Sequence, residues 1–132
     1  MLDFLTLPYW RHKEKLAHKH EQEIKEKCEL AEKKLDKISN YRFRAWVTAV
    51  RAQKELSKLK ADLPQSDLGT EDKIKQVTEK LVEARHNMGV SHAAKKNVLA
   101  ERERLLKELD AVQQELTSIS VKIKSLEKNS SQ

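Results

Sequence analysis

The chain has 132 residues, of which 36% are charged and 38% hydrophobic, with two glycines and two prolines. This apolar content is low for a single globular core but sufficient for long paired helices. The single cysteine, Cys28, excludes an intramolecular disulfide, and no apolar run approaches the ~20 residues of a membrane span. The formal net charge of +6 favours acidic partners.

Residues 1–8 form a short apolar N-terminal arm that ends at Pro8. The arm is too small to make a core, so it is either a frayed end or a segment that docks on the rest of the protein. It lacks the basic start and the small-residue cleavage site of a signal peptide. We therefore expect a cytoplasmic protein, with the nucleus as an alternative.

The first predicted helix covers residues 9–63, where apolar residues recur at alternating spacings of four and three. This is the 3.5-residue period of a coiled-coil seam. The seam residues are Ile24, Cys28, Ala31, Leu35, Ile38, Arg42, Ala45, Ala49, Ala52, Leu56, Leu59 and Leu63.

A turn over residues 64–70 separates this helix from a second one. Pro64 disfavours a continuous helix, Gly69 relaxes the backbone, and Thr70 is a good N-cap. The second predicted helix covers residues 71–128 and is followed by a polar, disordered tail over 129–132. Its seam comprises Ile74, Val77, Leu81, Ala84, Met88, Ser91, Lys95, Val98, Arg102, Leu105, Leu109, Val112, Leu116, Ile119, Ile123 and Leu126.

The two seams match one another along their full length. When the chain is folded back at the turn, the numbers of facing seam residues add up to 136 or 137 throughout. The sequence therefore predicts an all-α fold, a long antiparallel two-helix coiled-coil hairpin over 9–128 that packs with further helices in an oligomer or complex. The alternative, a parallel dimer with a broken middle, would stack Arg42 on its own copy inside the seam, which is unfavourable.

The middle of the hairpin has a local excess of positive charge. Residues 37–54 and 84–100 contain no carboxylate, and the predicted register places the two segments opposite each other. Their cations are Lys37, Arg42, Arg44, Arg51, Lys54, Arg85, Lys95 and Lys96. Because Arg42 faces Lys95 at the seam, we expect both side chains to reach outward or to meet an acidic group.

The same region has an aromatic strip beside the seam. Phe43, Trp46, Val47 and Val50 follow helical i, i+3, i+4, i+7 spacing, and Tyr41 lies close by. Exposed aromatic and arginine residues together are typical of binding hot spots. The predicted partner-binding residues are Tyr41, Arg42, Phe43, Arg44, Trp46, Val47, Val50, Arg51, Arg85, Lys95 and Lys96.

Three interpretations of this patch remain open at this point. The cations could form an ordinary solvated face, the aromatic strip could be covered in a homodimer, or both could bind a specific acidic partner. Gly89 lies within the weakest helix-forming stretch of the second helix, so we predict a kink or hinge there.

No catalytic motif is found in the sequence, and no histidine pair has the i, i+4 spacing of a helical metal site. We therefore expect no enzyme activity, no metal, no cofactor and no small-molecule substrate. The predicted function is a coiled-coil scaffold or adaptor subunit that binds acidic or helical protein partners, with self-association as a further possibility. The alternative is a helical module that uses the same basic residues to bind nucleic acid or an anionic membrane.

Overall fold

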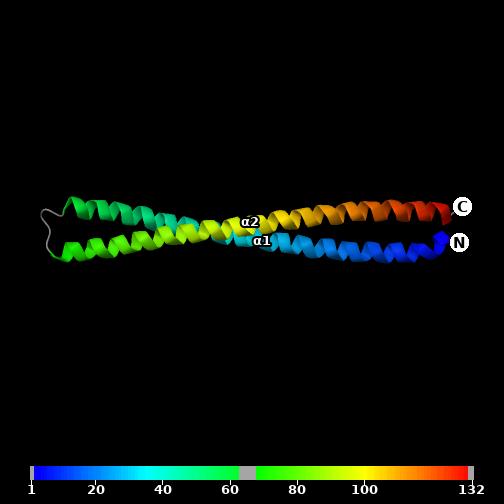
Figure 1. Ribbon diagram of the computed structural model, residues 1–132, viewed down its shortest axis with the longest axis horizontal. Helices are drawn as coiled ribbons and strands as arrows, with labels where there is room; N and C mark the ends of the chain where they lie inside the picture. Colours follow the sequence, from blue (N-terminus) through cyan, green and yellow to red (C-terminus); the bar gives the residue numbers. More distant parts are fainter. Residues whose placement is uncertain (1, 63–67, 131–132) are drawn as a thin grey trace. The chain divides into compact units, whose positions relative to one another are not determined.

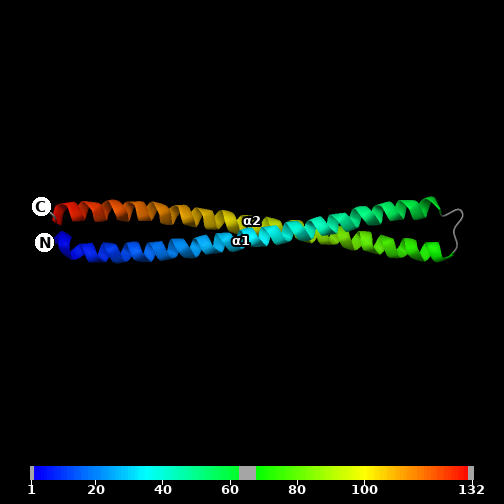
Figure 2. The same cartoon turned by 180° about the vertical axis from the view of Figure 1, so that it is seen from behind.

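The computed structural model describes residues 2–62 and 68–130, and their side chains over 6–62 and 69–129. Two helices are present, α1 over Leu2–Ala61 and α2 over Leu68–Ser130, and the described residues contain no strand. The helices pack against each other as a hairpin, which confirms the predicted fold class. Figures 1 and 2 show α1 and α2 side by side from opposite directions.

The contacts of the chain fall into two units, and both helices contribute to each unit. Unit 1 contains residues 1–32 and 100–132, so it combines the start of α1 with the end of α2. Unit 2 contains residues 33–99, so it combines the end of α1 with the start of α2. The start of α1 and the end of α2, blue and red in Figure 1, therefore belong to the same unit.

Every predicted seam residue that the structure describes is buried or half-buried. The seam residue Leu63 lies outside the described residues. Side-chain hydrogen bonds cross between the helices, among them those from Arg11 to Glu127, from Arg102 to Glu32 and from Arg85 to Gln53. The residue numbers of these pairs add up to between 134 and 138. This range contains the sums of 136 and 137 predicted for facing seam residues.

The core of unit 1 is an apolar cluster built from both helices. Ile24 is only 1% exposed, and Cys28 packs against the cluster as a small apolar residue. The buried members are Leu7, Ala17, Ile24, Leu105, Val112, Leu116, Ile119, Ile123 and Leu126.

The core of unit 2 is a smaller cluster with more alanine. Its buried members are Ala49, Ala52, Leu56, Val77, Leu81 and Ala84, with Leu59, Ile74 and Met88 packed against them. The described part of this cluster reaches no further than Ala49 on α1 and Met88 on α2. The half-buried cations Arg42 and Lys95 therefore lie at seam positions beyond the apolar cluster of their unit.

The start of α1 differs from the sequence-based prediction. The helix begins at Leu2 rather than after the arm, and Pro8 lies inside it. Pro8 has no N–H to donate, so one backbone hydrogen bond is lost there. Leu7 is buried in the same cluster as Leu126, and this packing favours continuing the helix through the proline.

The boundaries of α2 also differ slightly from the prediction. Gly69 and Thr70 lie in the first turn of α2 rather than before it, and Glu71 places a negative charge in that turn. Pro64 lies outside the described residues. Asn129, predicted to belong to a disordered tail, is the penultimate residue of α2. Differences of one or two residues are common at helix ends, where the last turn has few packing partners.

Candidate functional site

The net positive charge of the protein comes entirely from unit 2. Residues 33–99 contain 15 lysines and arginines against 8 aspartates and glutamates, a net charge of +7. Residues 1–32 and 100–132 contain 12 against 13, a net charge of −1. Unit 2 is therefore the part of the chain that electrostatics would bring to an acidic partner.

The ion pairs among the described residues have the opposite distribution, because all of them lie in unit 1. Two connect the helices, Arg11 to Glu127 at 3.0 Å and Arg102 to Glu32 at 2.8 Å. The other three connect neighbouring turns of one helix. In unit 2, Arg85 donates a 3.4 Å hydrogen bond to the neutral amide of Gln53. The described cations of unit 2 thus have none of the described carboxylates within ion-pairing distance.

A groove of about 300 Å³ lies beside the seam in unit 2. Its lining combines the two half-buried cations with apolar and aromatic side chains: Ile38, Ser39, Arg42, Phe43, Trp46, Met88 and Lys95. The rings of Phe43 and Trp46 are tilted by 31° with their centroids 6.1 Å apart. Both rings face solvent, since Phe43 is 62% and Trp46 51% exposed.

A second groove, of about 390 Å³, shares Arg42 and Lys95 with the first. Its remaining lining residues are His92, Lys96 and Leu99, all from α2.

Helix geometry places both grooves on one side of the seam. Ser39, Trp46 and Gln53 are seven residues apart and so share one face of α1, whereas Arg85, His92 and Leu99 share one face of α2. The hydrogen bond between Gln53 and Arg85 joins these two faces. We call the residues that line the two grooves the cationic face.

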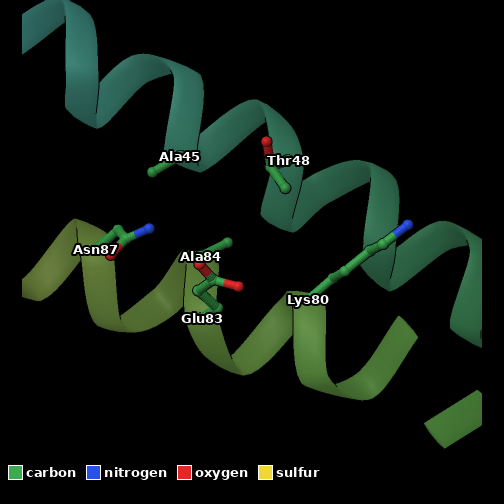
Figure 3. Close-up of a pocket in the computed structure, with 6 residues that line it drawn as sticks. All are labelled: Ala45, Thr48, Lys80, Glu83, Ala84 and Asn87. Atoms are coloured by element: carbon green, nitrogen blue, oxygen red, sulfur yellow. The ribbon is translucent and has the colours of Figure 1, made fainter. Parts of the chain in front are cut away.

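The other side of the seam has a different character. There a pocket of about 190 Å³ is lined by Ala45 and Thr48 from α1 and by Lys80, Glu83, Ala84 and Asn87 from α2 (Figure 3). The lining contains a carboxylate as well as an ammonium group, and it includes no aromatic ring. This pocket therefore differs from the cationic face, whose lining has cations without a carboxylate and includes aromatic rings.

The structure brings together five of the eleven predicted partner-binding residues in these grooves, namely Arg42, Phe43, Trp46, Lys95 and Lys96. Arg85 lies on the same side through its bond to Gln53. Val47 and Val50, the aliphatic members of the aromatic strip, are half-buried on α1 and line neither groove.

The remaining three predicted residues, Tyr41, Arg44 and Arg51, are exposed and line neither groove. Tyr41 is one heptad before Thr48, which lines the pocket on the other side of the seam, so Tyr41 faces away from Trp46. Arg44 and Arg51 are one heptad apart and share a face of α1.

The sequence analysis did not select Ile38, Ser39, Met88, His92 and Leu99 as members of this site. Ile38 and Met88 are seam positions, and their partial exposure arises where the apolar cluster ends. The heptad spacing of Ser39 from Trp46, and of His92 and Leu99 from Arg85, contained the signal that would have identified the others.

Gly89 lies in a continuous stretch of α2, and a Cβ atom added there would meet nothing within 4 Å. The predicted hinge at this residue stays a prediction.

Within the part of the chain that the structure describes, no group of three or more His, Cys, Asp or Glu residues could hold a metal ion. Over the same residues, neither helix is both long and apolar enough to cross a membrane.

Comparison with known proteins found no matching family model, no matching curated protein and no matching solved structure.

Proposed function

We propose that this chain is a non-catalytic coiled-coil scaffold or adaptor subunit that binds a protein partner through the cationic face of unit 2. The observation that carries the proposal is the combination of Arg42 and Lys95 with the exposed rings of Phe43 and Trp46 in adjoining grooves. Aromatic and arginine side chains at the centre of a patch are the usual composition of a protein-binding hot spot.

The composition of the grooves favours a protein over nucleic acid. Ile38, Met88 and Leu99 contribute apolar surface between the cations, and such surface is stabilised when another apolar group covers it. A phosphate backbone offers charge but no such group, so it would leave these side chains in water. An anionic membrane is disfavoured for a related reason, since the apolar residues are recessed among cations instead of forming one broad strip.

The test is to replace Trp46 by alanine and to measure partner binding. The side chain is half exposed, so its removal leaves the seam intact, and far-UV circular dichroism is expected to show unchanged helicity. Partner capture from a cell extract by the immobilised chain is expected to fall by about tenfold or more, the loss typical of a hot-spot tryptophan.

The matched control is Leu16→Ala, because Leu16 is 54% exposed on the same helix but lies in unit 1. This variant is expected to retain partner capture. Equal capture by the parent chain and the Trp46→Ala variant would contradict the proposal, as would equal losses in the two variants.

A further inference from the structure

We infer that the occupant of the cationic face is an acidic amphipathic helix that lies along the hairpin of unit 2 as a third helix. This inference rests on the proposed function and specifies the kind of partner. Its carboxylates would meet Arg42, Lys95 and Lys96, and its apolar residues would cover Phe43, Trp46 and Leu99.

The first argument is the placement of the cations. Arg42 and Lys95 are each half-buried and line both grooves, so they occupy the boundary between them. Two like charges held at one seam level repel each other, and a carboxylate placed between them would relieve this repulsion. An arginine can also hold a carboxylate through two parallel hydrogen bonds. The described residues of this chain place no carboxylate there.

The second argument is the helical spacing of the residues that line the grooves. Ser39, Phe43 and Trp46 follow i, i+4, i+7 along α1, and His92 and Leu99 are one heptad apart along α2. The grooves therefore follow the helix axes. A helix that presents apolar residues at i, i+3, i+4 and i+7 matches this direction and period, as in other helix-in-groove complexes. An extended peptide would present alternating sides and would match neither row.

The third argument is the charge of the possible partners. A second copy of this chain that packed its cationic face on the first would bring two excesses of positive charge together. Packing on unit 1 of a second copy would meet a net charge of only −1. Charge complementarity therefore favours a different, acidic chain over self-association.

The experiment uses the full chain with Trp10→Phe, which leaves Trp46 as the single tryptophan. The probe is a synthetic peptide of about 21 residues, or three heptads, with leucine at the seam positions and glutamate at the flanking positions. Binding should cover Trp46 and shift its fluorescence to shorter wavelength. We expect binding at least about tenfold tighter than that of a peptide of the same composition with scattered leucines, which cannot form an apolar stripe.

A paired set of charge variants tests the role of the two seam cations. Arg42→Gln with Lys95→Gln keeps polar side chains of similar length at the seam, and it is expected to weaken acidic-peptide binding by about tenfold or more. The matched control is Arg44→Gln with Arg51→Gln, which removes the same charge from exposed positions that line neither groove. The control is expected to change binding by less than about threefold, the effect of general charge alone.

Three outcomes would overturn the inference. They are equal binding of the scrambled acidic peptide, tighter binding of a DNA duplex, and tighter binding of phosphatidylserine vesicles. If the acidic peptide fails to bind but Trp46→Ala still abolishes capture of a natural partner, the proposed function stands and only the acidic-helix inference is wrong. If both experiments fail, the cationic face is not a docking site.

Discussion

Individual residues of this hairpin differ sharply in how far their side chains are buried, and their position relative to the seam decides the difference. Ile24 is 1% exposed, whereas Leu30, six residues later on the same helix, is 57% exposed. Both are large aliphatic residues, so hydrophobicity alone would not separate them. The heptad position separates them, because only Ile24 points toward α2.

This contrast predicts a difference in stability. Ile24→Ala removes buried methyl groups and leaves a cavity, so it is expected to lower the free energy of unfolding by about 2–4 kcal/mol. Leu30→Ala is expected to change it by no more than about 0.5 kcal/mol, as is usual at exposed sites. Urea denaturation followed by circular dichroism measures both, and similar losses would contradict the burial seen in the structure.

Gly89 allows a second prediction at the residue scale. Since an added Cβ would meet nothing within 4 Å, Gly89→Ala introduces no clash and removes backbone freedom from the unfolded chain. The variant is expected to raise the free energy of unfolding by about 0.5–1 kcal/mol. A loss of stability in thermal or urea unfolding would show that Gly89 needs a conformation outside the regular helix, as the hinge prediction requires.

Each helix contributes seam residues to both units, but the chemistry of the seam differs between the units. In unit 1 the seam is closed by large aliphatic residues such as Leu105 and Ile119. In unit 2 the cluster relies on alanines, and the seam then continues with Arg42 and Lys95. Ser91, which is also buried, satisfies its hydroxyl by donating a 2.8 Å hydrogen bond to the backbone carbonyl of Asn87.

The two seam cations, Arg42 and Lys95, are therefore expected to lower the stability of the helix pair. Replacing both cations, Arg42→Leu with Lys95→Leu, puts apolar side chains at seam positions and removes the repulsion. We expect the free energy of unfolding to rise by about 1–3 kcal/mol. We also expect the stability of this variant to depend less on salt than that of the parent, because salt screens the repulsion only where it exists.

Denaturant titrations at low and physiological ionic strength measure both effects. A loss of stability in the leucine variant would mean that the two cations are favourably solvated at the seam. That result would remove the physical basis for a carboxylate between them.

On the scale of the whole molecule, apolar packing and charge are distributed unequally between the two units. Unit 1 has the larger aliphatic cluster and every ion pair among the described residues. Unit 2 has the smaller cluster and the whole positive excess. Segments with few buried apolar contacts open more easily, and binding surfaces are often drawn from such segments.

This distribution predicts a pattern of amide hydrogen exchange. Apart from the helix ends, exchange is expected to be fastest in residues 89–96 of α2, which include Gly89 and Lys95 and lie beyond the apolar cluster of unit 2. Residues 105–119, within the cluster of unit 1, are expected to exchange at least about tenfold more slowly. Mass spectrometry of exchanged peptides measures this, and uniform protection across the two segments would contradict it.

The positions that pair the helices could be read from the sequence. A 3.5-residue period brings the same stripe of each helix toward its partner, so every seam residue predicted from spacing that the structure describes is buried or half-buried. The helix ends were harder to predict from the sequence. The sequence placed the start of α1 after Pro8, whereas the helix begins at Leu2, and Leu7 is buried in a cluster with residues of α2 that are distant in sequence.

The composition of the candidate site depended on the tertiary structure for a related reason. Spacing located the cations and aromatic residues in one region and places Tyr41 and Trp46 on opposite sides of the seam, but only the pairing with α2 shows which side combines the rings with Arg42 and Lys95. The same pairing adds Met88, His92 and Leu99 to the face that Arg42 and Lys95 share. Helical periodicity is a local property, and it specifies which stripe is buried. A groove is formed by two helices at once, so its lining is decided by how they pack.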